Sequence, residues 1–311
     1  MFVEELEVPS SGKGAPKGAF LLRTPQEVDK LLKSNVISLV INTGKGVDVN
    51  GTAHVASHSG SYSPADYKKD MLERFSAEEI REARKTVEDC NSAVRNIFSK
   101  ARTGNSFNQE HVTEVLGPVM KAEGNAAAAL IGIARLRDRD EATFLHSLAV
   151  SAMMVMFGRS LGLDEETNKT LGFAGLVHDM GKMVLPLEVL NKPGKLEGKE
   201  LAIMRSHPQR GYELLKKSGD MPQIVLDVCL YHHERYDGAG YPAKLAGEKI
   251  PFSARLAAVC DVYDAMTAVR PYKRGWSQSE TIDMMLRSTG HFDPDLLRKF
   301  VSNIVLTGAI V

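Results

Sequence analysis

Two adjacent histidines stand directly before a glycine-rich turn in the segment His232–Pro242, which reads HHERYDGAGYP. Other histidines and aspartates precede and follow this segment in a fixed order: His146, His178-Asp179, His207 and Asp261. Five of the nine histidines belong to this series. Imidazole nitrogens and carboxylate oxygens together suit divalent transition metals. The series therefore predicts a metal site that several helices assemble.

Each member of the series is weak evidence by itself. A lone histidine among apolar neighbours, such as His146, is more often a hydrogen-bonded core residue. His207 precedes a proline and on its own suggests a loop or a helix start. Asp261 lies among apolar residues, where a buried carboxylate needs a cation or a hydrogen-bond donor. The adjacent pair His232-His233 is harder to explain structurally, and the complete series favours a metal site.

We expect two metal ions that share one carboxylate. The first ion takes ligands from His146, His178, Asp179 and Asp261, and the second from Asp179, His207, His232 and His233. Mixed nitrogen and oxygen ligands favour iron or manganese over a closed thiolate zinc site. Such a pair of ions holds a hydroxide and a phosphate in line, which is the chemistry of two-metal hydrolases.

This series resembles the HD superfamily of metal-dependent phosphohydrolases. The segment His232–Pro242 resembles its HD-GYP subgroup, as do the residues that follow it: Leu245, Gly247, Ile250-Pro251, Ala254-Arg255, Asp261, Tyr263-Asp264-Ala265, Thr267 and Arg270-Pro271-Tyr272. The resemblance spans roughly residues 140–300. It implies a phosphodiesterase that hydrolyses the bacterial second messenger cyclic di-GMP to linear pGpG, to GMP or to both. The N-terminal part resembles a small domain of unassigned function that precedes some HD-GYP domains.

One position departs from a pattern within this family. Some HD-GYP proteins carry a glutamate four residues before the first histidine, where it serves a third metal, but this chain has Ala142. Glu141 stands five residues before His146, roughly 140° away around a helix. The sequence therefore favours two metal ions over three.

Several residues are candidates for handling the substrate. Lys182 follows Asp179 by three residues, so it could reach a phosphate bound there, although a lysine after Gly181 could also be solvated. The resemblance implies that Arg270 and Lys273 contact the ligand. Tyr241 either lines the pocket rim or packs the turn that Gly238 and Gly240 permit. We expect Asp179 and Lys182 to be catalytic, and the substrate contacts to be Lys182, Gly240, Tyr241, Arg270 and Lys273.

The elements that position these residues are predicted to be mainly helical. Residues 1–62 suggest a small α/β regulatory domain, with strands near 19–22 and 36–41 and a helix that begins at Thr24-Pro25. Residues 63–107 suggest a helical linker, in which Ser63 and Ser76 begin helices. Residues 108–311 suggest an all-helical catalytic domain, with helices expected over 108–135, 141–161, 165–178, 198–217, 221–234, 252–269, 277–288 and 294–303.

The linker helix carries a continuous apolar stripe at helical spacing: Ile80, Ala83, Val87, Cys90, Ala93 and Ile97. We expect this stripe to form a homodimer seam that relays the state of the N-terminal unit. The alternative is that it packs onto the catalytic domain of its own chain.

Composition excludes some classes of function. Basic and acidic residues both number 39, so the chain has no net positive charge that would favour binding to nucleic acid. The 3 cysteines form no CxxC pair, which favours a reducing cytoplasm. The longest apolar stretch is too short to span a bilayer, so we expect a soluble protein.

Two further hypotheses compete with cyclic di-GMP hydrolysis. The chain could hydrolyse a related cyclic dinucleotide such as cyclic GMP-AMP, since the metal motif does not read the bases. It could instead be a receptor that binds the dinucleotide without turnover, although the complete ligand series and Lys182 speak against that. A generic HD nucleotidase would leave the segment 232–242 and Arg270–Lys273 unexplained.

Overall fold

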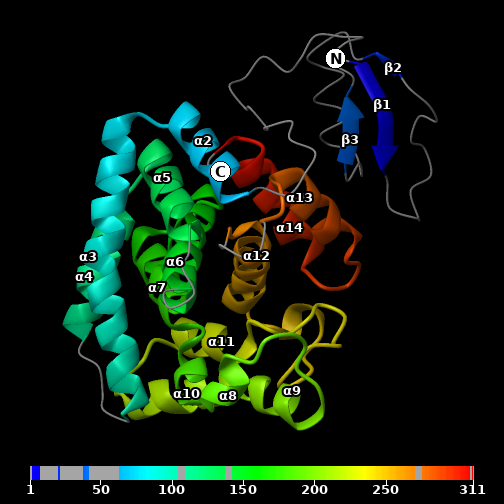
Figure 1. Ribbon diagram of the computed structural model, residues 1–311. Helices are drawn as coiled ribbons and strands as arrows, with labels where there is room; N and C mark the ends of the chain where they lie inside the picture. The colour runs from blue at the N-terminus through cyan, green and yellow to red at the C-terminus, as the bar shows by residue number, and fades with distance from the viewer. Residues whose placement is uncertain are drawn as a thin grey trace. The chain divides into compact units, whose positions relative to one another are not determined.

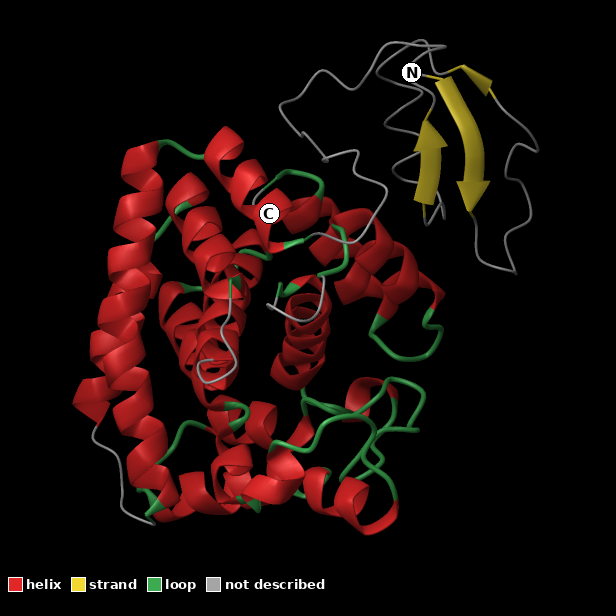
Figure 2. Ribbon diagram, viewed as in Figure 1, coloured by secondary structure: helices red, strands yellow, loops and turns green. Residues whose placement is uncertain are grey.

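The structure is a computed structural model that describes residues 2–7, 20–21, 38–41, 63–103, 109–136, 142–269, 275–308 and 310. The chain divides into two compact units, Met1–Ala53 and His54–Val311. The described part of the second unit consists of helices and the loops between them (Figure 2). The prediction of a mainly helical chain is confirmed.

The first unit contains a three-stranded antiparallel sheet in the order β2-β1-β3. Its strands are β1 (Phe2–Glu7), β2 (Phe20–Leu21) and β3 (Ser38–Ile41). The strands β2 and β3 fall within the two predicted segments. The sequence analysis missed β1, because its three glutamates dilute the β-forming residues. The helix predicted at Thr24-Pro25 lies outside the described residues, so the α/β character of this unit stays a prediction.

The helical unit begins with α2 (Pro64–Arg74) and the long helix α3 (Ala77–Arg102). Ser63 caps α2 by accepting the backbone N–H of Asp66, and Ser76 accepts from Glu79 before α3, as predicted. The other long helices are α4 (Gln109–Lys121), α5 (Gly124–Arg135), α6 (Ala142–Ser160), α7 (Glu165–Val177), α10 (His207–Lys217), α11 (Gln223–Tyr231), α12 (Phe252–Thr267) and α13 (Gln278–Arg287). Shorter helical segments are η1 (Met180–Val184), α8 (Leu187–Leu190), α9 (Gly198–Met204), η2 (Gly247–Lys249), α14 (Pro294–Phe300) and η3 (Val301–Val305).

Two helices that we predicted as continuous are broken. The helix expected over 108–135 is divided into α4 and α5, where Gly124 has a positive φ of 50°. The helix expected over 198–217 is divided into α9 and α10. Pro208 has no N–H with which to bond the carbonyl of Met204, four residues earlier, so the helix cannot continue through it. The helix expected over 221–234 ends at Tyr231, which places His232 and His233 beyond its last turn.

The core of the second unit surrounds α6 and α7, which pack against each other and contact α4, α5, α11 and α12 between them (Figure 1). Nearly every side of α6 is apolar and buried, as at Leu148, Val150, Met153 and Val155. A helix that is apolar all round belongs in the interior. His146 lies on this central helix, and therefore on one of the best-packed elements of the unit.

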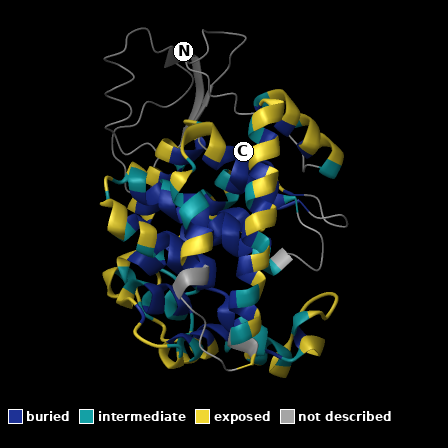
Figure 3. Cartoon of the chain, turned by 90° about the vertical axis from the view of Figure 1, so that its left-hand side faces the viewer, coloured by how far each residue is buried: buried dark blue, intermediate teal, exposed yellow. Residues whose placement is uncertain are grey.

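The apolar stripe of α3 packs inside its own chain. Every residue of the stripe is buried in the hydrophobic core, and α3 contacts α4 and α5. The opposite face is exposed (Figure 3), and it carries charged residues such as Arg81, Arg84, Lys85 and Glu88. The stripe is therefore not a surface through which two chains could associate, and that part of our dimer interpretation is wrong.

The three cysteines, Cys90, Cys229 and Cys260, are free and buried. Among the helices that the structure describes, none has the length and apolar content needed to cross a membrane.

We predict that Val87→Asp lowers the free energy of unfolding by about 3 kcal/mol or more, because it places an unpaired carboxylate in the core. Chemical denaturation measures this change. The control Glu88→Ala, on the exposed face, should shift stability by no more than about 0.5 kcal/mol. A Val87→Asp protein that is as stable as the parent but smaller in mass by light scattering would show that the stripe joins two chains.

Candidate metal centre

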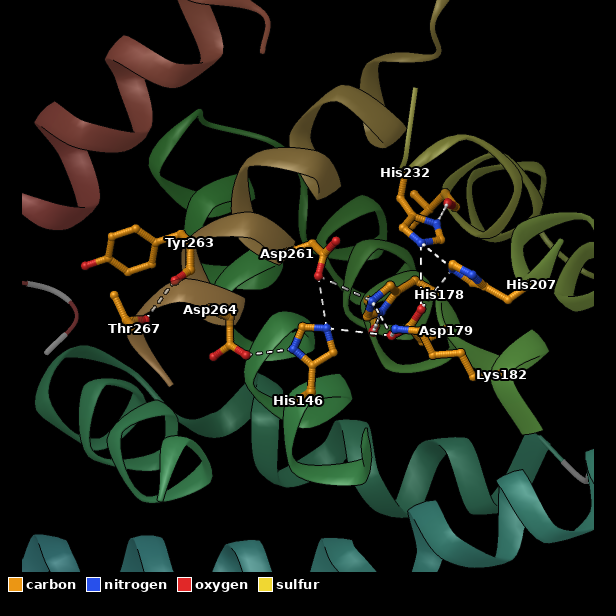
Figure 4. Close-up of polar contacts among 12 residues, drawn as sticks. His146, His178, Asp179, Lys182, His207, His232, Asp261, Tyr263, Asp264 and Thr267 are labelled. Carbon is orange, nitrogen blue, oxygen red and sulfur yellow. Dashed lines mark hydrogen bonds and ion pairs between the residues drawn. The ribbon is translucent and has the colours of Figure 1, made fainter. Parts of the chain in front are cut away.

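The predicted ligands meet where several helices end (Figure 4). His146 projects from α6 and Asp261 from α12, whereas the others lie at helix ends. His178 follows the last residue of α7, His207 is the first residue of α10, and His232 follows α11. The chain thus brings together side chains that are far apart in the sequence.

Four of the histidines are held through the same ring nitrogen. Nδ1 lies 2.7 Å from Asp264 Oδ2 in His146, 2.8 Å from Gly175 O in His178, 2.8 Å from Met204 O in His207 and 3.0 Å from Val228 O in His232. Because a carbonyl or carboxylate oxygen only accepts, Nδ1 carries the proton and donates. In His178, His207 and His232, whose Nδ1 is held by a backbone carbonyl, Nε2 is then the nitrogen left to bind a metal.

The Nε2 atoms of these histidines face Asp179, whose two oxygens point to different sides. Oδ1 lies 3.2 Å from His207 Nε2 and 3.8 Å from His232 Nε2. Oδ2 lies 3.5 Å from His178 Nε2 and 3.8 Å from His146 Nε2. Asp179 therefore separates two groups of donors and can serve both.

Asp261 completes the group on the Oδ2 side. Its Oδ1 lies 3.0 Å from His146 Nε2 and 3.9 Å from His178 Nε2. On the other side, His233 joins Asp179, His207 and His232, and the donor atoms of these four residues lie within 4.8 Å of one another. Ligand atoms that each lie about 2 Å from one ion are expected to be about 3 Å apart.

Two buried atoms in this cluster lack hydrogen-bond partners among the described residues, His178 Nε2 and Asp179 Oδ1. Both residues are about 1% exposed. A buried polar atom without a partner is costly, and a metal ion would satisfy both atoms. The donor set, its spacing and these unpaired atoms fit a two-metal centre.

Burial and neighbouring charges set the protonation of the cluster. Burial lowers the pKa of His178 and takes that of His232 well below its usual value. It also lowers the pKa of His233 to about 3, so these rings are neutral. Burial opposes ionisation of Asp179, but the ammonium group of Lys182 outweighs burial and holds the pKa of Asp179 well below its usual range. Neutral imidazoles around an ionised carboxylate are the state that metal binding requires.

His146 differs from the other rings. Burial disfavours its protonated form, but hydrogen bonds to Asp261 and Asp264 outweigh burial and raise its pKa to about 8. The pKa of Asp261 is lowered in turn, because its hydrogen bond to His146 overcomes the cost of burial.

Lys182 lies beside this cluster. Its Nζ donates to Asp179 Oδ2, and its side chain is 25% exposed. The ammonium group is therefore close to the predicted bridging carboxylate and still accessible from solvent.

A stack of side chains covers the other side of the cluster. The Tyr241 ring lies on His233, with centroids 4.9 Å apart and an interplanar angle of 28°. The guanidinium carbon of Arg205 lies 5.3 Å from the centroid of Tyr241. Gly240 precedes this stack, and a Cβ there would lie 2.3 Å from Arg235 N, so only glycine fits. The structure thus gives Gly240 a packing role in the turn.

Two predicted substrate-binding residues, Arg270 and Lys273, lie outside the described residues, as does Glu141. Ala142 is the first residue of α6, and its helical position is one turn before His146.

Sequence reasoning missed residues that support the site. Asp264, Arg135 and Glu234 are buried, and Asp264 holds His146. Glu234 accepts the backbone N–H groups of Ala243 at 2.6 Å and Leu245 at 3.1 Å, which fixes the turn that carries Tyr241. A second carboxylate one helical turn after Asp261 was a signal for Asp264, because both project from one side of α12.

Comparison with known proteins agrees with this geometry. A model of the HD domain matches residues 130–296, and a model of a domain of unknown function (DUF3391) matches residues 1–112. The cyclic di-GMP phosphodiesterase PA4108 of Pseudomonas aeruginosa is 39% identical over 304 residues, which cover 95% of this chain and 72% of that protein. The cyclic di-GMP phosphodiesterase response regulator RpfG of Xanthomonas campestris is 38% identical over 60% of this chain and 49% of its own length.

Two other proteins extend the comparison. The 3′3′-cGAMP-specific phosphodiesterase 2 of Vibrio cholerae is 36% identical over 51% of this chain and 31% of its own length. The solved structure of Bd1817, an HDG"Y"P protein from Bdellovibrio bacteriovorus, has the same fold, with a TM-score of 0.59 at 17% identity over 78% of this chain and 77% of that chain. From the family model and the match to PA4108, the chain belongs to the HD domain family, in its HD-GYP form, with a DUF3391 domain in its N-terminal part.

Proposed function

We propose that the chain is a cyclic di-GMP phosphodiesterase that cleaves its substrate to linear pGpG, to GMP or to both. The observation that supports this most directly is the position of Asp179, whose two oxygens face two groups of donors. The relatives named for cyclic di-GMP support the substrate, since one of them matches 95% of this chain.

We assign His146, His178, Asp179 and Asp261 to the first metal ion and Asp179, His207, His232 and His233 to the second. Iron and manganese suit this mixture of nitrogen and oxygen donors. When bound, the two ions supply an activated hydroxide and neutralise charge on the phosphate. The protein holds His178, His232 and His233 as neutral imidazoles and keeps Asp179 ionised between them.

Lys182 is the residue of this chain that acts on the reacting phosphate. Its ammonium group is next to Asp179 Oδ2 and is partly accessible, so it can move to a phosphate oxygen at the same place. A positive charge at that place stabilises the negative charge that develops during attack on phosphorus.

The substrate is long enough to need contacts beyond the metal centre. Tyr241 stacks on the ligand His233, and the guanidinium group of Arg205 lies beside the Tyr241 ring, so Arg205 can contact a base or a second phosphate next to this stack. Gly240 brings the backbone close to the same place. Arg270 and Lys273 supply further positive charge in our proposal, with the guanidinium offering paired donors to a phosphate or to guanine.

Hydrolysis of cyclic GMP-AMP is the second candidate, because relatives specific for 3′3′-cGAMP also match this chain. The bound metal ions would act on the phosphodiester linkage that both substrates share, so the metal centre does not distinguish between them. A receptor without turnover would not require His178 Nε2 and Asp179 Oδ1 to be left without protein partners.

The remaining organisation also belongs to our proposal. We divide the chain into a regulatory domain of α/β type at 1–62, a helical linker at 63–107 and a catalytic domain at 108–311, acting in the cytoplasm. A homodimer through the linker helix would have to use the exposed, charged face of α3, since the apolar face is buried.

We expect protein that is loaded anaerobically with iron or manganese to cleave cyclic di-GMP faster than 3′3′-cGAMP. Chromatography of the products measures both rates and separates pGpG from GMP. Asp293→Asn, which alters a carboxylate outside the donor set, is the activity control. Cleavage of 3′3′-cGAMP alone would transfer the proposal to the second substrate, and binding of both without cleavage would support a receptor.

Metal analysis of the loaded protein should give about two ions per chain. Asp179→Ala should lose most of this metal and lower turnover by roughly 100-fold or more, because both ions lose a ligand. Three ions per chain would mean that Glu141 or another carboxylate is recruited. An Asp179→Ala protein that keeps two ions and normal turnover would contradict the assignment of the bridge.

Lys182→Ala and Arg270→Ala should have different kinetic effects. Lys182→Ala should lower kcat about 100-fold, because its charge acts on the reacting phosphate. Arg270→Ala should raise KM about tenfold, which matches the loss of a charged hydrogen bond. Both variants should bind metal as the parent does. Equal loss of metal from both proteins would show that these residues are structural.

A further inference from the structure

A buried ion pair lies behind His146, away from the proposed reaction. Arg135 is the last residue of α5 and Asp264 lies on α12, and the side chains of both are fully buried. Arg135 Nε lies 3.4 Å from Asp264 Oδ1, and the guanidinium carbon lies 5.0 Å from the centroid of Tyr263. Burying two charges costs more solvation than their attraction often repays, so stability alone is a weak reason for such a pair.

The two oxygens of Asp264 have different partners. Oδ1 faces Arg135. Oδ2 accepts the Nδ1–H of His146 at 2.7 Å (Figure 4). On the opposite side of the same ring, Nε2 lies 3.0 Å from Asp261 Oδ1. Asp264 therefore fixes the rotation of the ring and holds a proton on Nδ1, which leaves Nε2 directed at Asp261 and the first metal site.

His146 depends on a side chain where the other histidines depend on the backbone. His178, His207 and His232 each donate Nδ1–H to a main-chain carbonyl. His146 is inside α6, where the carbonyls are already used by the helix, so it needs a partner from another element. Asp264 on α12 supplies it, and the charge on that carboxylate makes the hydrogen bond stronger than one to a carbonyl.

Arg135 is itself held in place from two sides. Its main-chain oxygen accepts the N–H of Val269 at 3.2 Å, just beyond the end of α12. Tyr67 on α2 donates its hydroxyl to Gly132 O at 3.3 Å, one turn earlier on α5. The guanidinium therefore stands at a fixed place beside α12, where it balances the charge of Asp264.

We propose that Arg135 and Asp264 form a positioning pair, which presents Nε2 of His146 to the first metal ion. The pair does not contact the reacting phosphate, and it acts through the affinity of one of the two metal sites. This proposal rests on the metal assignment in the proposed function. It is independent of which cyclic dinucleotide the protein cleaves.

The experiment measures binding of Mn²⁺ alone to the full chain by anaerobic titration calorimetry, with electron paramagnetic resonance to separate coupled from isolated ions. The parent should take up two ions. Asp264→Asn should bind the ion of the first site about 10- to 100-fold more weakly, the range found when a partner of a ligating histidine is changed. The affinity of the site at His207, His232 and His233 should stay within about threefold, a factor that corresponds to well under 1 kcal/mol.

The double variant Arg135→Met, Asp264→Asn separates positioning from folding. Replacement of a buried ion pair by neutral side chains often preserves stability, so this protein should unfold near the parent's temperature. It should still bind Mn²⁺ weakly at the first metal site, because the amide is a poorer acceptor than the carboxylate. A stable double variant that binds both ions as tightly as the parent would overturn the proposal.

Asp293→Asn is the matched control. Asp293 also pairs with an arginine, Arg255 on α12, and it caps α14. Its loss should reduce stability and leave both Mn²⁺ affinities unchanged. An equal loss of Mn²⁺ affinity in Asp293→Asn and Asp264→Asn would mean that any damage near α12 disturbs the site.

If the parent binds two ions and cleaves no cyclic dinucleotide, the proposed function fails. The Mn²⁺ affinities of the variants still test the positioning pair in that case.

Discussion

The carboxylate of Asp179 is the group on which the rest of the site depends. It is about 1% exposed, yet neighbouring charges keep it ionised despite the cost of burial. Its two oxygens face opposite groups of histidines, with Lys182 on one side. A buried charge of this kind needs cations around it, and the protein alone provides only part of the compensation. The geometry of the donors follows from satisfying this one carboxylate from both sides.

The way the histidines are oriented follows from ordinary helix chemistry. The last carbonyls of a helix have no partner within the helix. His178 and His232 stand just beyond α7 and α11, where Nδ1–H of His178 reaches Gly175 O and Nδ1–H of His232 reaches Cys229 O. At His207 the carbonyl of Met204 is available because Pro208 lacks an N–H. Helix ends thus both place these rings and select the tautomer, whereas His146, inside a helix, requires Asp264.

The set of metal donors could be predicted from the sequence, because these histidines and aspartates follow one another in a recognisable order along the chain. The structure brings all seven predicted ligands into one region, and it confirms the helical character of the second unit. The break before His207 was missed because the periodicity of apolar residues continues across it. The stripe on α3 could not be assigned from the sequence, because a core face and a dimer face have the same pattern.

Contacts between residues far apart in the sequence could not be predicted. Arg135 and Asp264 are 129 residues apart, and no local pattern shows that their side chains meet. The same holds for Arg205 and Tyr241, which become neighbours only when α9 and the turn after α11 pack together. Residues whose role depends on one local motif were predictable, and residues whose role depends on packing between distant helices were not.

The central claim is that Asp179 bridges two ions, and a crystal structure of the anaerobically Mn²⁺-loaded protein with anomalous scattering tests it most directly. We predict two anomalous peaks, one near Oδ1 with His207, His232 and His233, and one near Oδ2 with His146, His178 and Asp261. A single peak, or two peaks that both lie on one oxygen of Asp179, would contradict the account.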